Sequence, residues 1–250
     1  MSRTPARLAA VLGLFLCGPV WAADLTVLGA ASLANPGKEM APPVRAQNPD
    51  TKVLLNFGAS GALLQQIAKG APADVFASAD QESMDQAQAQ SLVKPAERRN
   101  FVSNSLVVIV PATGGPSPKA LADLGQPAYR RIAIGLPASV PVGRYTKGVL
   151  EKAGLWATIE PKMIGAQNVR QALDYVARGE VDAGFVYGTD AAVMADKVKV
   201  ALTVPTEVPV LYPIAPVTSG PNAAAAQKFV AFVLTPPAQA VLAKHGFGKL

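Results

Sequence analysis

Residues 51–80, TKVLLNFGASGALLQQIAKGAPADVFASAD, carry the pattern that decides the fold class. The segment opens with a strand-like apolar run, TKVLLNFGAS, and turns at glycines into the helix-like run GALLQQIAKG. A second strand-like run, ADVFASA, follows directly. A strand, a helix and a second strand in this order are typical of a βαβ unit, whose two strands are parallel. The segment therefore predicts an α/β protein with a mainly parallel sheet flanked by helices.

The same alternation continues on both sides of this unit and restarts once. A strand-like run at residues 24–32 precedes the unit, and a new series begins after residue 103. The new series consists of NSLVVIVP (104–111), RIAIGLP (131–137), YTKGVLEKAGL (145–155), VRQALDYVARG (169–179) and DAGFVYG (182–188). Half of the 250 residues are hydrophobic, which is enough for one large core or two modest ones. The restart predicts two lobes of similar construction.

Two segments are expected to carry the chain between these lobes. NSLVVIVP leads out of the first lobe, and LYPIAPV, residues 211–217, leads back into it. Pro213 and Pro216 indicate that the second segment is an extended connector and not a helix. The helical segment after it would complete the first lobe. We expect residues 23–103 and 214–250 to form lobe I and residues 104–213 to form lobe II, with two crossover strands as a hinge and a ligand cleft between the lobes.

The first 22 residues, MSRTPARLAAVLGLFLCGPVWA, are typical of a secretory signal peptide. Arg3 and Arg7 precede a short apolar run, and the small residue Ala22 marks the expected cleavage site. The apolar run is too short for a membrane anchor. Because Leu16 and not a small residue precedes Cys17, a lipoprotein is less favoured. The sequence thus predicts export to the periplasm.

Composition argues against several kinds of site. Cys17 is the only cysteine and His245 the only histidine, so the mature chain has no cysteine nucleophile, and a zinc site is not favoured. Without Arg3 and Arg7, the formal charge falls from +6 to +4. The basic residues form no run, so nucleic-acid binding is not favoured, whereas a mild attraction for anionic ligands is expected.

Strand-to-helix turns are the expected ligand site in an open α/β sheet. LGAAS (28–32) ends the first strand with Ser32, and FGASG (57–61) ends the second with Ser60. Each serine would stand at a helix start, where unpaired N–H groups and the helix dipole favour an anion. The alternative is that each serine only caps its helix. Two such turns on neighbouring strands favour the anion site.

The second lobe offers similar turns. PASVPVGRY (137–145) contains a glycine turn, and AQNVRQAL (166–173) begins a helix with Asn168 as its cap and Val169 in its first turn. Tyr187 ends a strand and is followed by glycine, although it could equally be a packed aromatic residue. Arg144 and Arg170 are the charged candidates, and either could instead face solvent.

The ordered set of segments resembles a known family. AAS (30–32), FGASGAL (57–63), KGAPADVFASAD (69–80), SNSLVVIVP (103–111), VPVGRYTKGVLEKAGLW (140–156), NVRQAL (168–173), GFVYGTDA (184–191) and KHGF (244–247) together are similar to the periplasmic molybdate-binding proteins of molybdate ABC importers, the ModA family. Each motif alone is weak, but the set covers nearly the whole chain after the signal peptide.

This resemblance implies a type II periplasmic-binding-protein fold that closes two lobes around a tetrahedral oxyanion. The residues implied as ligands are Ser32, Ser60, Val142, Val169 and Tyr187, with the serines and Tyr187 donating hydroxyl bonds and the valines backbone N–H bonds. The family often has alanine where this chain has Val142. The resemblance further implies a monomer that is not an enzyme, holds no cofactor and binds molybdenum only as molybdate, or tungsten as tungstate. Its protein partner would be the membrane permease.

Other functions stay open at this stage. Molybdate is fully ionised near neutral pH and suits a site made only of donors, but sulfate or another small oxyanion satisfies the same donors. A serine hydrolase would need Ser60 as nucleophile, His245 as base and an aspartate such as Asp190. Its G-x-S-x-G elbow is incomplete, because Ala62 stands at the second glycine.

Overall fold

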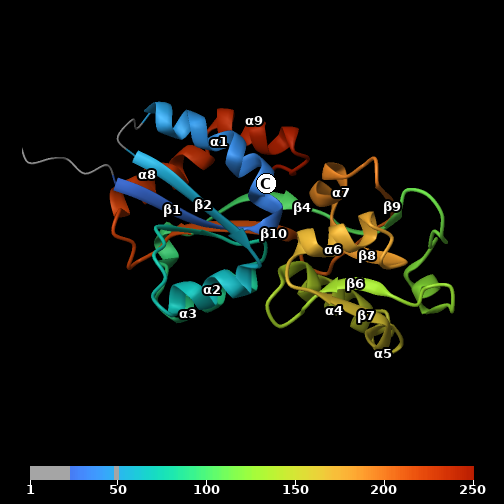
Figure 1. Ribbon diagram of the computed structural model, residues 1–250. Helices are drawn as coiled ribbons and strands as arrows, with labels where there is room; N and C mark the ends of the chain where they lie inside the picture. Colours follow the sequence, from blue (N-terminus) through green and yellow to red (C-terminus); the bar gives the residue numbers. More distant parts are fainter. Residues whose placement is uncertain (1–22, 48–50) are drawn as a thin grey trace, which may run out of the picture.

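The computed structural model describes residues 23–47 and 51–250, so the predicted signal peptide lies outside the described residues. The described residues form two five-stranded sheets. The sheets lie next to one another, and each is flanked by helices (Figure 1). The first sheet has the strand order β2-β1-β3-β10-β4 and the second β7-β6-β8-β5-β9. The bounds of the first sheet's strands are β1 Ala23–Ala30, β2 Thr51–Gly58, β3 Val75–Ala77, β4 Arg99–Asn104 and β10 Val210–Pro216. Those of the second sheet are β5 Leu106–Pro111, β6 Ile132–Gly135, β7 Met163–Ala166, β8 Ala183–Tyr187 and β9 Val198–Val204.

Each sheet has four strands in one direction and one reversed strand. In the first sheet, β1 is parallel to β2 and β3, whereas β10 is antiparallel to both of its neighbours, β3 and β4. In the second sheet, β6 is parallel to β7 and β8, whereas β5 is antiparallel to β8 and β9. The predicted mainly parallel α/β architecture is confirmed.

Helices cover both faces of the first sheet (Figure 1). On one face lie α1 (Ala34–Gln47), α8 (Ala223–Val233) and α9 (Pro236–Lys244), and on the other lie α2 (Ser60–Ala68) and α3 (Gln81–Ala89). Alternation along β1 serves the two faces: Val27 belongs to the core that contains Met40 of α1, and Leu28 to the core that contains Leu63 of α2. A strand buried on both faces reads as a continuous apolar run, as this one does.

The second sheet is covered by α4 (Pro141–Lys152), α5 (Trp156–Ile159), α6 (Val169–Ala177) and α7 (Gly188–Val193). Both α4 and α6 pack against β6 and β8. Short 3-10 helices complete the elements: η1 (Ala31–Leu33), η2 (Pro95–Glu97), η3 (Leu121–Gly125) and η4 (Glu160–Lys162).

The chain passes between the sheets twice, once at Ser105 between β4 and β5 and once through residues 205–209 between β9 and β10. We call the first sheet with its helices lobe I and the second sheet with its helices lobe II. The segment expected to be only an extended connector forms β10, a buried inner strand of lobe I. The register shifts between Tyr212 and Pro213, and this irregularity accommodates a residue that has no N–H to donate.

None of the helices in residues 23–47 and 51–250 has the length and apolar character needed to cross a membrane.

Candidate functional site

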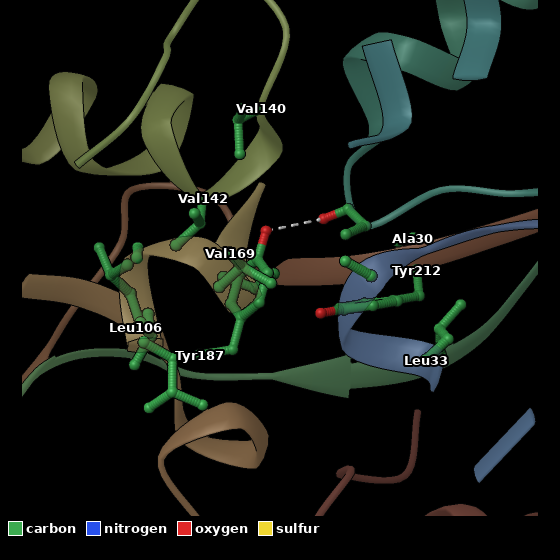
Figure 2. Close-up of a cluster of buried hydrophobic side chains, with 14 of the residues drawn as sticks. Ala30, Leu33, Leu106, Val140, Val142, Val169, Tyr187 and Tyr212 are labelled. Carbon is green, nitrogen blue, oxygen red and sulfur yellow. Dashed lines mark hydrogen bonds between the residues drawn. The ribbon is translucent and has the colours of Figure 1, made fainter. Parts of the chain in front are cut away.

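The five predicted ligand residues lie around one small cavity where the two lobes meet. Ser32, Ser60, Val142, Val169 and Tyr187 all line it, and its empty volume is about 200 Å³. The remaining lining residues are small or apolar: Ala30, Ala31, Gly58, Ala59, Ala79, Val140 and Pro141. Figure 2 shows Val140, Val142, Val169 and Tyr187 reaching in from lobe II, opposite Ala30 on the side of lobe I. The structure thus brings together residues up to 155 positions apart in the sequence.

The lobe I side is built from two adjacent strand ends. Strand β1 pairs in parallel with β2, and Ala30 lies opposite Gly58 in the register. The chain therefore leaves both strands at the same edge of the sheet and enters η1 and α2 side by side. Ser32 is in η1 and Ser60 is the first residue of α2, and both are buried. As the sequence predicted, each serine is at a helix start.

The lobe II side presents the first turns of α4 and α6. Pro141 opens α4 and has no N–H, so the N–H of Val142 is the first that this helix offers. At α6 the capping side chain of Asn168 accepts from the N–H groups of Arg170, at 2.9 Å, and Gln171, at 3.1 Å. The Asn168 side chain does not accept from the N–H of Val169, the first residue of the helix. The first N–H of each helix therefore belongs to a residue that lines the cavity.

The hydroxyl of Ser60 already accepts one hydrogen bond. Its Oγ accepts a 3.1 Å hydrogen bond from the N–H of Ala79, which also lines the cavity. This bond leaves the serine proton for a ligand in the cavity. The turn FGASGAL (57–63) contains no carboxylate, so the Ser60 proton and the backbone N–H groups are what it can offer a ligand.

Tyr187 also acts as a donor, and it reaches across the lobes. Its Oη donates to the carbonyl oxygen of Ala79 in lobe I at 3.4 Å, drawn as the dashed line in Figure 2. Burial raises the pKa of this phenol well above its usual 10. The hydroxyl therefore keeps its proton at every physiological pH. The long bond to Ala79 is the kind that an anion could replace.

The two arginine candidates do not line the cavity. Arg144 donates through Nε to Asp80 at 2.7 Å and through Nη2 to Ser83 at 2.7 Å. Nε of Arg170 lies 2.5 Å from Oδ1 of the fully buried Asp190. Each arginine is thus paired with a carboxylate, and the lining residues that the structure describes include no charged side chain.

Both arginines connect the lobes. Arg144 of α4 is paired with Asp80, which caps α3 in lobe I. Arg170 of α6 donates to Oδ1 of Asn35 at 3.1 Å and to the carbonyl oxygen of Ser32 at 3.4 Å, both in lobe I. Gly61 of lobe I adds a 3.0 Å backbone bond to the carbonyl oxygen of Ser139 in lobe II. The lobes are therefore held against one another around the cavity.

The residues needed for serine hydrolysis are not assembled. His245, the proposed base, is hydrogen-bonded to Glu39 at 2.8 Å and does not line the cavity. Asp190 is paired with Arg170 and not with a histidine. Within residues 23–47 and 51–250, no group of three or more metal-ligating side chains occurs.

Three residues of the site were not predicted from the sequence. Ala79 accepts from Tyr187 and donates to Ser60, and Tyr212 and Asn104 lie behind Ser32 in a hydrogen-bonded chain. Tyr212 is 180 positions from Ser32 in the chain, so no local pattern links the two. The segment SNSLVVIVP, which contains Asn104, was singled out only as a crossover strand and by its resemblance to a family.

Comparison with known proteins identifies the family. A sequence model described as "Bacterial extracellular solute-binding protein" matches residues 25–248. The molybdate-binding protein ModA of Escherichia coli K12 is 37% identical over 234 residues, which cover 89% of this chain and 88% of that protein. The chain belongs to the ModA family. The resemblance seen in the sequence is confirmed, and a solute-binding family rules out the hydrolase alternative.

Solved structures place this ModA-family chain in the expected fold. The periplasmic molybdate-binding protein of Azotobacter vinelandii superposes with a TM-score of 0.77 at 27% identity, covering 89% of this chain and 98% of that one. The sulfate-binding protein SubI of Mycobacterium tuberculosis has a TM-score of 0.81 at 19% identity, covering 91% of this chain and 87% of that one. The second likeness shows the fold alone. The two-lobed periplasmic-binding-protein architecture predicted from the sequence is confirmed.

Proposed function

We propose that this protein captures molybdate, or tungstate, between its two lobes and delivers it to the membrane permease of an ABC importer. The observation that carries the proposal is the cavity itself, where neutral donors from both lobes converge and the lining residues in the described part of the chain include no charged side chain. The names of the family members support molybdate as the ligand. On this proposal Ser32, Ser60, Val142, Val169 and Tyr187 are the ligand residues.

The donor set matches a fully ionised oxyanion. Molybdate offers only acceptors, and each hydrogen bond from a neutral donor to its charged oxygens contributes about 1.5–3 kcal/mol. The first turns of α2, α4 and α6 add aligned backbone dipoles, which favour negative charge. Hydrogen phosphate would need an acceptor for its remaining proton, and none of the lining residues among 23–47 and 51–250 is a carboxylate.

The size of the cavity restricts the ligand further. The space open to the centre of a water-sized sphere is about 10 Å³, far below the roughly 300–1,000 Å³ of a pocket for an organic ligand. A tetrahedral oxyanion fits this restriction, whereas a sugar or an amino acid does not. Sulfate is the second candidate because it satisfies the same donors. As the smaller ion, it cannot reach all of the donors at once, so molybdate and tungstate are preferred.

The rest of the proposal concerns processing and organisation. We propose that residues 1–22 are removed on export and that the mature protein works as a periplasmic monomer. We also propose residues 23–103 with 214–250 and residues 104–213 as the extents of lobes I and II. The strand membership of the two sheets supports two such lobes but moves their boundaries, since the chain changes sheets at Ser105 and at residues 205–209, and Asn104 and residues 210–213 belong to the first sheet.

Thermal unfolding of residues 23–250 with added anions tests the assignment. A ligand that binds only the native state stabilises it by RT ln(1 + [L]/Kd), or about 2.7 kcal/mol at ~100 Kd. We expect molybdate and tungstate to stabilise the protein most, sulfate less, and phosphate least. Absence of a shift with both molybdate and tungstate would refute the proposal, and a larger shift with sulfate would favour the second candidate.

Val169 allows the backbone donor to be tested by itself. Proline is favoured at the first helical position, and Asn168 already has the extended backbone, φ −162° and ψ 172°, that a residue before proline prefers. Val169→Pro should therefore keep the helix and delete one N–H. We expect about 10- to 100-fold weaker molybdate binding, because one hydrogen bond to a charged ligand is lost.

Val169→Ala is the matched control, since it shortens the same buried side chain and keeps the N–H. Its molybdate Kd should stay within about threefold of that of the unmodified protein, a change of well under 1 kcal/mol. Equal losses in the alanine and proline variants would mean that packing and not the N–H matters. Ser60→Ala should likewise weaken molybdate binding and leave the fold intact, whereas failure to fold would indicate that Ser60 serves only α2.

A further inference from the structure

A chain of hydrogen bonds leads from Asn104 through Tyr212 to Ser32. Nδ2 of Asn104 donates to Oη of Tyr212 at 3.1 Å, and this Oη lies 2.9 Å from Oγ of Ser32. Asn104 and Tyr212 come from β4 and β10, the neighbouring strands next to the two crossings, and Val210 lies opposite Asn104 in their register. Neither Asn104 nor Tyr212 lines the cavity, so both stand behind the ligand residue.

The orientation of the Asn104 amide is fixed by its neighbours. Oδ1 accepts from the backbone N–H of Ser105 at 2.9 Å, and a backbone N–H can only donate. The NH₂ group must therefore face the other way, where its two hydrogens reach Oη of Tyr212 and Oγ1 of Thr189, the latter at 2.9 Å. The Asn104 amide can therefore act on Tyr212 only as a donor.

This orientation of the amide favours one direction for the whole series of hydrogen bonds from Asn104 to Ser32. Because Oη of Tyr212 accepts from Asn104, its own proton is free to be donated to Oγ of Ser32. Oγ of Ser32 then accepts from the tyrosine, and the serine proton is left for the cavity. In this direction the buried tyrosine proton has an acceptor, whereas in the reverse direction Oη would accept from both Asn104 and Ser32 and its own proton would point at neither.

The tyrosine ring is held in place for this task. Tyr212 is fully buried, and its ring makes edge contacts with Phe101, Tyr187 and Phe247 at centroid distances of 6.4, 5.8 and 5.4 Å. Figure 2 shows the Tyr212 side chain lying beside the site, with its hydroxyl directed toward lobe II. Burial also raises the pKa of this phenol well above 10, so the hydroxyl stays protonated.

We propose that Asn104 and Tyr212 are positioning residues that orient the Ser32 hydroxyl as a donor toward the cavity, and so favour fully deprotonated oxyanions. This inference rests on the proposed function, in which Ser32 binds the anion. Without the chain, the Ser32 hydroxyl could rotate and accept a hydrogen bond from a protonated ligand such as hydrogen phosphate. Tyr212 thus contributes to specificity without touching the ligand.

Tyr212→Phe tests the tyrosine's part. We expect about fivefold weaker molybdate binding by calorimetry, since a donor that supports and orients Ser32 is lost. Phosphate binding should not weaken, so the ratio of the phosphate to the molybdate Kd falls. Tyr129→Phe is the matched control, because Tyr129 is another buried tyrosine that does not line the cavity. Its ratio should equal that of the unmodified protein.

Asn104→Asp tests the direction of the chain. A carboxylate can only accept, so Tyr212 would donate to it, accept from Ser32 and draw the serine proton away from the cavity. We expect about 10- to 100-fold weaker molybdate binding, more than for Tyr212→Phe. The added negative charge would weaken binding as well, but that effect acts through space and does not need the tyrosine hydroxyl.

The double variant Asn104→Asp/Tyr212→Phe separates the two effects. If the hydrogen bonds transmit the effect, Asn104→Asp weakens molybdate binding less in the Tyr212→Phe protein than in the unmodified one. In the Tyr212→Phe protein only the effect of the added negative charge is left. Equal costs in both backgrounds, or an unchanged phosphate to molybdate ratio in Tyr212→Phe, would overturn the inference. If the unmodified protein binds neither anion, the proposed function fails instead, so the two failures are distinguishable.

Discussion

The ion pair between Arg144 and Asp80 is expected to act as a latch that exists only when the lobes are closed. Arg144 extends from α4 of lobe II, and Asp80 caps α3 of lobe I. Separation of the lobes would return both side chains to water. Replacing Arg144 by methionine keeps most of the side-chain length and removes the charge and the donors. We expect this change to weaken anion binding without altering the stability of the ligand-free, open protein.

The size of the effect follows from the burial of the pair. The Arg144 side chain is 14% exposed and that of Asp80 is 5% exposed, and Nη2 of Arg144 lies 2.7 Å from Oδ2 of Asp80. An exposed pair is worth about 0–1 kcal/mol, and breaking a fully buried one costs about 3–5 kcal/mol. A largely buried pair whose members regain water on opening falls between these limits. About 1.5 kcal/mol, or roughly a tenfold rise in the molybdate Kd, is the expected cost.

Kinetics distinguish a latch from simple charge attraction. A charge that steers an anion changes the association rate, whereas a contact made after closure changes the dissociation rate. Stopped-flow measurements on Arg144→Met should show faster dissociation with an association rate changed by less than about threefold. Small-angle X-ray scattering checks closure. At saturating molybdate both proteins should be closed, and at the same subsaturating molybdate concentration the variant should contain more open molecules.

Lys147→Met is the matched control. Lys147 is on the same helix and is paired with Glu151 within lobe II, at 3.3 Å, so its loss removes the same charge without crossing the lobes. A similar rise in Kd for both variants would refute the latch, and so would a slower association that accounts for the whole loss in Arg144→Met.

Three further outcomes are expected from residues around the site. Burial raises the pKa of the Asp190 carboxyl to about 6, above the ordinary 3.8. As the pH rises, the unfolded chain therefore loses this proton before the folded protein does, and the free energy of unfolding falls by about 3 kcal/mol between pH 4 and 6. Asp190→Asn should flatten this part of the pH profile measured by urea unfolding. Gly143→Ala should lower the free energy of unfolding by about 1–3 kcal/mol in urea titrations, because the added Cβ would lie 1.9 Å from the carbonyl oxygen of Gly135. Val142→Ala keeps its N–H and should retain molybdate binding within about threefold in calorimetry, whereas a larger loss would show that the side chain shapes the pocket.

The sequence was sufficient to predict the fold because its signals are local. Short apolar runs alternate with helix-like runs, and glycine turns separate them, as in residues 51–80. The same local signals predicted that Ser32, Ser60 and Val169 stand at helix starts, and the structure confirms those positions. The identity of the ligand did not follow from these patterns. It came from the family resemblance and stays a proposal.

What the sequence could not predict depends on contacts between distant segments. Pro213 and Pro216 led to the prediction of an extended connector, and the segment instead forms β10 between β3 and β4, where a register shift at Tyr212 and Pro213 accommodates the missing donor. Asn104 and Tyr212 become neighbours only when β4 and β10 pair. Their role behind Ser32 is therefore a property of the tertiary structure and is absent from any window of sequence.

On the proposed function, the pairing of both arginines would give the site its selectivity. A free guanidinium facing the cavity would attract any small anion, because Coulomb attraction depends little on the shape of the ion. Here Asp80 and Asp190 take up the two guanidinium groups, and the cavity is left with neutral donors in fixed positions. Such donors discriminate by geometry and by protonation, since an ion of the wrong size or with its own proton leaves some of them unpaired. The charges instead hold the lobes together, so closure and recognition are assigned to different groups of the same helices, α4 and α6.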